Sequence, residues 1–410
     1  MLAADVLKEA ERVMIICNAC RYCEGYCAVF PAMERRLTFS NDDLIYLANL
    51  CHDCRACYYA CQYAQPHEFD LNVPKTLGEL RIEAYREFAW PRLFSGLLRR
   101  NPLSIGLITA SCFMMILLLL IASRGTETLF SAYTGAGAFY AVIPYISIAL
   151  PITALGLAVL AVLTKQMVSF WRGMGSNIRA MTRLQVNLYA VWDVLRLRYL
   201  DGGGYGCNYP HDRFSFIRRW LHHLVFYGFM LCVISTGLAG AYHHFLHRYA
   251  PYPLWSWPVI LGTAGGTTLL IGTAGLLYLK MRMDPEPAAL HMLSLDMGFL
   301  LLLFLTSLTG MVLLVFRASS AMGILLAIHI ALVVALFATL PYGKFVHAIY
   351  RYAALVRNAI EQSHVPCRGM SFAGDHRQGG TTNSCLPAVI AIIRQSYSRV
   401  FFSPFLNSGR

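Results

Sequence analysis

The chain has 410 residues, of which 57% are hydrophobic and 14% are charged, and its mean hydropathy is +0.50. These values exclude an ordinary soluble domain and indicate an integral membrane protein. The formal charge of +12 does not indicate nucleic-acid binding, because the Lys and Arg residues concentrate at the ends of apolar segments. We therefore expect membrane lipid, and no nucleic acid, among its partners.

Eight of the thirteen cysteines lie in the first 61 residues, in two copies of the pattern Cys-x2-Cys-x2-Cys-x3-Cys. This is the spacing of bacterial two-cluster ferredoxins, in which the fourth cysteine of each run ligates the other cluster. The spacing therefore predicts two [4Fe-4S] clusters with crossed ligands. The predicted ligands are Cys17, Cys20, Cys23 and Cys61 for the first cluster, and Cys51, Cys54, Cys57 and Cys27 for the second.

Two other uses of these cysteines fit the sequence less well. Structural zinc usually takes paired cysteines or Cys/His sets, whereas here three cysteines at two-residue intervals occur twice. Disulfides need an oxidising compartment, and the short, charged, amphipathic stretch before Cys17 does not have the features of a cleavable signal peptide. We therefore expect residues 1–74 to form a cytoplasmic dicluster domain.

Residues 75–100 predict an amphipathic linker helix that runs to Trp90, breaks at Pro91 and lies along the membrane surface. Six apolar runs follow, each near the length of about 20 residues that a helix needs to cross the hydrocarbon. They cover residues 103–123, 136–164, 222–242, 255–279, 291–316 and 321–341. The predicted fold is mainly α: a ferredoxin-like α-helical domain with two [4Fe-4S] clusters, then a six-helix transmembrane bundle over residues 101–358.

Basic residues near the spans predict the orientation. They are dense before the first span, in the loop 165–220, between the fourth and fifth spans and after the sixth, whereas the opposite loops hold only Arg124, Arg248 and Arg317. We therefore expect a multi-pass protein of the bacterial inner membrane, with the cluster domain and both termini in the cytoplasm. Residues 359–410, rich in Ser, Gly and Asn, are expected to form a mobile tail.

Histidines in the third and sixth spans form a second candidate site, because polar residues at membrane depth tend to mark function. Since these two spans run antiparallel, their histidines can pair at the inner side and at the outer side, and each pair could ligate a b-type haem. We therefore expect one or two haems. The candidates are His222 or His223 with His347 on the inner side, and His244 or His243 with His329 on the outer side.

The helical phase helps to choose among these histidines. His222 and His244 are 22 residues apart, which leaves them about 40° from the same face of a helix and makes them the better same-face pair. Pro341 stands between His329 and His347 and is expected to end or kink the sixth span there.

Residues 201–207, DGGGYGC, form a glycine-rich motif. A dinucleotide site would need a strand before this motif and the start of a helix after it. Neither is predicted, because the preceding AVWDVLRLRYL has the pattern of an amphipathic helix and the following NYPHDRFS that of a turn. We therefore expect a tight backbone turn that docks near the clusters.

The sequence resembles the tricarballylate utilisation protein B (CitB-like) family of membrane iron-sulfur proteins. The segments that carry the resemblance are CNACRYCEGYCAVFPAMERR, CHDCRACYYACQYAQPHEFDLNVP, LRYLDGGGYGCNYP and HHLVFYGF. The membrane part is also similar to the gamma subunit of respiratory nitrate reductase, in which two histidine pairs hold two haems. The resemblance implies a protein that reoxidises the reduced flavin of a separate FAD-containing tricarballylate dehydrogenase and passes electrons to the respiratory chain.

Two functions remain open. The first is an electron-transfer protein that reoxidises a flavoprotein dehydrogenase through two [4Fe-4S] clusters and b-type haem, with the quinone pool as acceptor. The second is a quinol-oxidising membrane anchor that feeds a nitrate- or heterodisulfide-type reductase. A transporter or a redox sensor is a third class, and spans without charged midplane residues or paired broken helices argue against transport.

Overall fold

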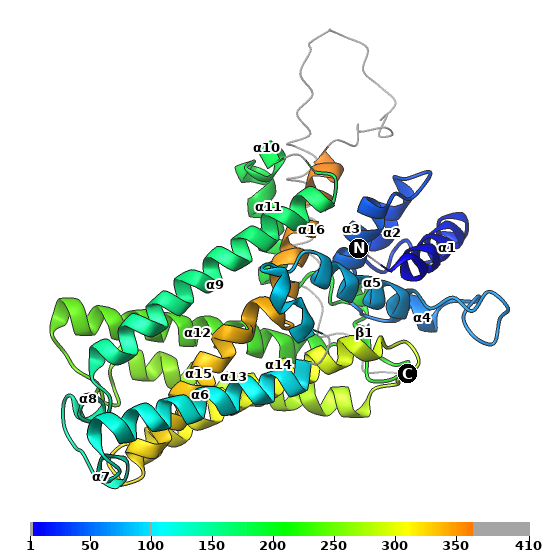
Figure 1. The fold of residues 1–410 in the computed structure, drawn as a ribbon. Helices are drawn as coiled ribbons and strands as arrows, with labels where there is room; N and C mark the ends of the chain where they lie inside the picture. The colour runs from blue at the N-terminus through cyan, green and yellow to red at the C-terminus, as the bar shows by residue number, and fades with distance from the viewer. Residues whose placement is uncertain (1–2, 99–100, 177, 364–410) are drawn as a thin grey trace, which may run out of the picture. The chain divides into compact units, whose positions relative to one another are not determined.

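The computed structural model describes residues 3–98, 101–176 and 178–363, which form a mainly α-helical chain (Figure 1). Residues 1–360 form one unit, and the tail expected over residues 359–410 lies, from residue 364 on, outside the described residues. The N-terminal part consists of short helices. They are α1 (Ala4–Cys20), α2 (Val29–Glu34), α3 (Asn41–Leu50), α4 (Ala56–Tyr59) and α5 (Val73–Glu87), followed by the 3-10 helix η1 (Arg92–Leu98).

The N-terminal helices begin with clear caps and share one core. At the start of α3, Ser40 accepts a hydrogen bond from the Asp43 N–H and the Asp43 carboxylate accepts one from the Ser40 backbone. Helix α5 packs against α1 and α3 and buries Leu77 and Leu80 among them. The linker helix was predicted to reach Trp90, but α5 ends at Glu87. One face of α5 lies in this core.

Among the described residues, six helical stretches are long and apolar enough to cross a membrane. This confirms the predicted mainly α fold with six long apolar helices and suggests a multi-pass membrane protein. In Figure 1, α6, α13, α14 and α15 run side by side. The stretches are α6 (Asn101–Arg124), α9 (Tyr145–Gly173), α12 (Ile217–Leu246), α13 (Trp257–Arg282), α14 (Leu290–Phe316) and α15 (Met322–Thr339), which continues through η3 (Leu340–Tyr342) into α16 (Val346–Ser363).

Two spans differ from simple continuous helices, each at a proline. The second was expected from residue 136, but α9 begins at Tyr145, after Pro144, because a residue before proline avoids the helical conformation. Residues Ala138–Val142 form the separate short helix α8. In the sixth span, α15 ends at Thr339 and Pro341 lies in η3, which confirms the predicted interruption. His329 and His347 therefore lie on different helices.

The remaining elements connect the spans. Helices α12 and α13 pack closely. A Cβ added at Gly265 would lie 2.8 Å from the Gly228 carbonyl oxygen, so only glycine allows this approach. This close packing fixes α12, which carries His222 at its start. The connecting elements are α7 (Glu127–Phe130), α10 (Ile178–Met181), α11 (Leu184–Leu195), η2 (Gly202–Gly204) and the antiparallel pair β1 (Cys207–Asn208) and β2 (Phe214–Ser215).

Candidate functional site

The structure brings the cysteines of the two motifs together in a crossed arrangement. Cys17, Cys20 and Cys23 line one cavity together with two cysteines of the second motif, Cys61 and Cys57. Burial raises the pKa of the Cys17 thiol to about 12, with further contributions from the neighbouring Cys23, Cys61 and Cys20. We call Cys17, Cys20, Cys23 and Cys61 the first cysteine set.

The other four cysteines form the second cysteine set: Cys27, Cys51, Cys54 and Cys57. Burial, followed by the neighbouring Cys51 thiol, raises the pKa of Cys27 to about 12. Burial also raises the pKa of Cys54 and of Cys57, and Cys27 contributes to both shifts. Each set thus combines three cysteines of one motif with the fourth cysteine of the other, as the ferredoxin pattern predicts for the ligands.

Residues with left-handed backbone shape both cysteine loops. Helix α1 ends at Cys20, and Arg21 at φ 56° turns the chain toward Cys23. After α3, Asp53 at φ 55° and Arg55 at φ 65° turn the chain twice between Cys51 and the start of α4. The Asp53 N–H donates to the Cys51 sulfur at 3.4 Å, so the turn also directs a backbone donor at a thiol.

The donor set fits an iron-sulfur cluster. Within the described ranges, no three His, Cys, Asp or Glu side chains converge closely enough to bind a single metal ion, and the thiols of the first set instead line a shared cavity. Burial and the neighbouring thiols raise the pKa of Cys17 and Cys27, so these side chains are protonated at neutral pH unless a bound cation offsets that effect. Thiolates are the ligands that such clusters take.

Buried arginines hold the loop of the second set. Arg81 donates to the carbonyl oxygens of Ala48 and Cys51, both at 2.8 Å, and Arg351 donates to the same Cys51 oxygen at 2.8 Å. Arg218 donates to the carbonyl oxygens of Asp53 and His52. These guanidinium groups come from α5, α16 and α12, so the loop between α3 and α4 is bound by three helices.

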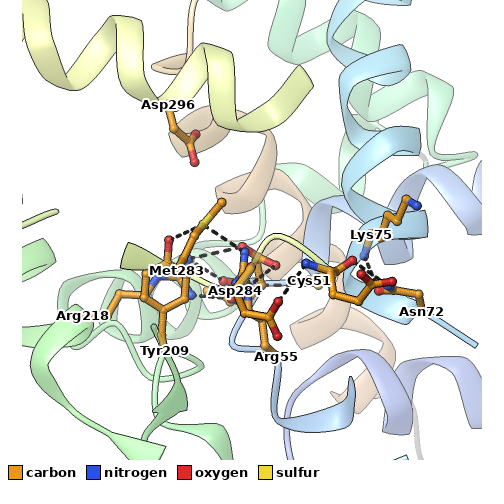
Figure 2. Close-up of polar contacts among 12 residues, drawn as sticks. Cys51, Arg55, Asn72, Lys75, Tyr209, Arg218, Met283, Asp284 and Asp296 are labelled. Carbon is orange, nitrogen blue, oxygen red and sulfur yellow. Dashed lines mark hydrogen bonds and ion pairs between the residues drawn. The ribbon is translucent and has the colours of Figure 1, made fainter. Parts of the chain in front are cut away.

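One further cation, Arg55, joins Arg218 at an aromatic ring in this region. The guanidinium groups of Arg55 and Arg218 lie 4.7 and 4.9 Å from the centre of the Tyr209 ring. Figure 2 shows these side chains gathered around Met283 and Asp284 in the loop after α13, where Arg55 donates to the Asp284 carbonyl oxygen at 3.0 Å. The second cysteine loop is therefore tied to the loop between the fourth and fifth spans.

The carboxylate nearest these arginines is Asp53. Burial raises the pKa of Asp53, but the charges of Arg55 and Arg218 outweigh that effect and hold the pKa below its usual range. The Nε atoms of Arg55 and Arg351 are buried without a hydrogen-bond partner. This surplus of buried positive charge and N–H donors fits an anionic group, such as a thiolate-ligated cluster, beside the loop.

The glycine-rich segment and Asn208, which follows it, contact the two cysteine loops. Gly203 has φ +76°, and a Cβ there would lie 2.7 Å from the carbonyl oxygen of Gly25, between Cys23 and Cys27. The N–H of Asn208 donates to the Cys54 carbonyl oxygen at 3.0 Å. These contacts agree with the predicted tight turn near the clusters. Cys207, buried beside Cys54, belongs to this segment and was not among the predicted site residues.

One of the predicted histidine pairs faces across two helices. The rings of His222 on α12 and His347 on α16 have centres 6.2 Å apart at an interplanar angle of 79°. Two imidazoles that share one iron have ring centres about 6 Å apart, because each metal–nitrogen bond is about 2 Å. Nδ1 of His347 donates to the Lys344 carbonyl oxygen at 2.6 Å, which leaves Nε2 with its lone pair. Haem-ligating histidines need this tautomer.

The other predicted histidines make different contacts. Nε2 of His244 is 2.7 Å from the Tyr145 hydroxyl, and the His243 ring stacks on the Tyr145 ring with centres 3.5 Å apart. Nδ1 of His329 is 3.2 Å from the Thr309 hydroxyl on α14. His329 and His244 are thus held by separate partners. His223 lines an open cleft of about 470 Å³ with Arg219, Trp220 and Tyr227, residues of the same helix α12.

A buried cluster of charged side chains lies next to His347 and was absent from the sequence prediction. The Asp296 carboxylate on α14 pairs with Lys280 at the end of α13 and with Lys344, whose Nζ is 2.6 Å from Oδ1. The same Lys344 supplies the carbonyl that accepts from His347. One acidic residue in the fifth span, with a lysine ending the fourth, was the signal in the sequence for this cluster.

Arg81, Arg218 and Arg351 were also missed. For Arg218 and Arg351 the signal was the spacing, because Arg218 precedes His222 by four residues and Arg351 follows His347 by four. At that spacing each arginine shares a helix face with its histidine.

Comparisons with known proteins agree with this site. The family model described as citrate utilization protein B matches residues 96–366, and the model of its Fer4-like domain matches residues 10–87. The citrate utilization protein B of Escherichia coli is 47% identical over 368 residues, which cover 90% of this chain and 95% of the relative. No solved structure matches the chain. A Fer4-like domain with these cysteines implies iron-sulfur clusters and suggests electron transfer. This chain therefore belongs to the citrate utilization protein B (CitB) family.

Proposed function

We propose that this protein reoxidises the reduced flavin of a partner dehydrogenase and passes the electrons to the quinone pool. One observation carries the proposal: the loop of the second cysteine set contacts, through Arg218 and Arg351, the two helices that bring His222 and His347 together. Centres that carry one electron at a time, arranged in this order, connect a two-electron flavin to an acceptor in the membrane.

The contacts described above support a proposed set of ligands. In the proposal, the first and second cysteine sets would hold one [4Fe-4S] cluster each, and His222 and His347 would hold a b-type haem. The Lys344 carbonyl fixes the His347 ring, and the Asp296 carboxylate holds Lys344 in place. The separate contacts of His244 and His329 favour one haem over two.

We infer that the cysteine sets and both termini face the cytoplasm of a bacterium and that the helices cross its inner membrane. The support comes from the basic residues at the helix ends on the side of the cysteine sets, such as Lys280, Arg282 and Lys344, which the positive-inside rule places in the cytoplasm. Reduced thiols and oxygen-sensitive clusters also fit that compartment.

The proposed partner is an FAD-containing dehydrogenase of a tricarboxylate, with tricarballylate as the substrate implied by the sequence resemblance. The name of the Escherichia coli relative refers to the utilization of citrate. Citrate, like tricarballylate, is a tricarboxylate. Flow in the opposite direction, from quinol through the same residues to a reductase, uses the same ligands and is distinguished by experiment.

The test combines the purified full-length protein, the substrate-reduced dehydrogenase and a soluble quinone under anaerobic conditions, with flavin, cluster and haem absorbance recorded together. With the protein in catalytic amount, the flavin should become fully oxidised only when quinone is also present. Flavin that stays reduced in the complete mixture would contradict the proposal. Faster reduction of the clusters by quinol than by the flavoprotein would support the quinol-oxidising alternative. The Cys54→Ala variant is the control without one cluster.

A further inference from the structure

The two cysteine motifs have the same spacing but different surroundings. In the second set, Cys51, Cys54 and Cys57 are buried and Cys27 is partly exposed, whereas all four cysteines of the first set are partly exposed. Tyr22, inside the first loop, is 68% exposed. The first set therefore lies where a soluble partner can approach, and the second set lies inside the protein.

The charges near the two sets also differ. Arg81, Arg218 and Arg351 donate to the backbone of the second loop, and Arg55 lies within that loop at 1% exposure. The carboxylate of Asp53 ion-pairs with two of these four guanidinium groups, at 3.8 Å from Arg55 and 3.9 Å from Arg218. The second loop therefore carries a net positive environment with little water to screen it.

The charged residues of the first loop make no comparable buried contact in the part of the chain that the structure describes. Arg21 and Glu24 are both exposed and have opposite charges. Arg21 bonds to the Asn18 carbonyl oxygen at the surface, where water and salt screen its charge.

The arginines also connect the second loop to the histidine pair. Arg218 lies four residues before His222 on α12, and Arg351 lies four residues after His347 on α16. Four residues correspond to a rise of about 6 Å along a helix. Both helices that carry a facing histidine thus place an arginine about one turn away, in contact with residues 51–53.

We propose that the cluster held by the second cysteine set is the exit toward His222 and His347, and that Arg218 and Arg351 give it the higher reduction potential of the two. Buried positive charge stabilises the reduced form, which carries one more negative charge. The cluster of the first set is then the acceptor from the partner. Each transfer between the centres moves one electron, so two transfers oxidise one reduced flavin, whose N5 proton is released to the solvent. This inference rests on the proposed function for its direction.

The test is an anaerobic redox titration of the full-length protein followed by electron paramagnetic resonance, without partner or quinone. The wild type should show two cluster potentials, and the higher one should be the signal lost in Cys54→Ala. Arg351→Gln and Arg218→Gln should each lower the higher potential and leave the lower one unchanged. A tenfold fall in the reduced-to-oxidised ratio at fixed potential corresponds to 59 mV for one electron.

Two control variants separate charge from structure. Arg351→Lys keeps the charge and should restore most of the shift. Arg357→Gln, on the same helix but ion-paired with Asp43 at 2.9 Å, should leave both potentials unchanged. If Arg351→Gln fails to fold, Arg218→Gln and the wild-type order of potentials still decide.

The inference is overturned if the second set has the lower potential, or if the two Gln variants shift neither potential or both equally. Failure of the proposed function gives a different result, because flavin would then stay reduced in the complete mixture while the order of the potentials stands.

Discussion

The two ends of the helix bundle both carry histidines, but they use them differently. At the end near the cysteine sets, His222 and His347 face each other across two helices among buried charges. At the far end, the Tyr145 ring stacks on the His243 ring, and the Tyr145 hydroxyl forms a hydrogen bond with His244. The difference shows that spacing along a helix brings histidines to the same level, whereas the side chains of neighbouring helices decide whether two of them meet.

The strongest way to break this comparison is to remove the cysteine ligands on which the near end depends. Cys54→Ala should lose about four irons and four labile sulfides per chain out of about eight of each. Iron and sulfide analysis after anaerobic purification measures this. Cys207→Ala is the matched control, because Cys207 is buried beside Cys54 outside the motifs, and it should retain both clusters. Equal losses in both variants would contradict the ligand assignment.

The histidines test the two ends directly. His222→Ala and His347→Ala should each abolish haem absorbance while the cluster iron remains, because an axial ligand is lost. His244→Ala at the far end should keep the haem. The measurement is the absorbance spectrum of reduced protein together with total iron. Haem that survives both near-end substitutions and disappears with His244 would reverse the comparison.

The charge cluster behind His347 predicts a large effect on stability. Asp296→Ala leaves Lys280 and Lys344 buried without their carboxylate, which should cost about 3–5 kcal/mol. Thermal unfolding in detergent measures the loss. Asp193→Ala removes the partner of Arg198, whose side chain is 60% exposed, and should cost about 0–1 kcal/mol. A similar loss in both variants would show that the buried cluster has no special weight.

The glycine contact predicts a smaller effect. Gly203→Ala places a Cβ against the Gly25 carbonyl at a positive φ, which should cost about 1–3 kcal/mol and loosen the first cysteine loop. Gly204→Ala is the control, because its φ is +104° but open space surrounds the added Cβ. Thermal unfolding and iron retention compare the two. Equal effects would mean that backbone strain alone matters and that the contact with the loop does not.

The smallest effect is expected at the far end. Tyr145→Phe removes the hydroxyl that bonds to His244 and should cost about 0.5–1.5 kcal/mol, with haem content unchanged. Unfolding in detergent and the haem spectrum report both quantities. Loss of haem in this variant would place a cofactor at the far end.

The fold was predictable where the signal is local. The six apolar helices follow from hydropathy, and the interruption of the sixth span follows from Pro341. The start of α9 was missed because apolar residues before Pro144 continue the hydropathy of the span without continuing the helix. The core position of α5 was missed because an amphipathic face fits a protein core as well as a membrane surface.

The motif spacing predicts the crossed cysteine ligands, which stay a prediction. The structure brings Cys61 to the cavity of the first motif and Cys27 beside Cys51. The phase argument favoured His222 with His244, but it cannot tell which face of α12 meets α16, and of these two only His222 faces its predicted partner, His347. Arg81, which comes from α5 to the Cys51 carbonyl, has no local signal at all, because the contact joins residues 30 apart in the sequence.

The most direct test of the proposed relay is to mix the reduced flavoprotein with the wild type and with Cys54→Ala in a stopped-flow spectrometer, without quinone. In the wild type, cluster bleaching should precede haem reduction, and in Cys54→Ala the haem should stay oxidised. Haem reduction at the wild-type rate in Cys54→Ala would contradict a path through the second cysteine set to His222 and His347.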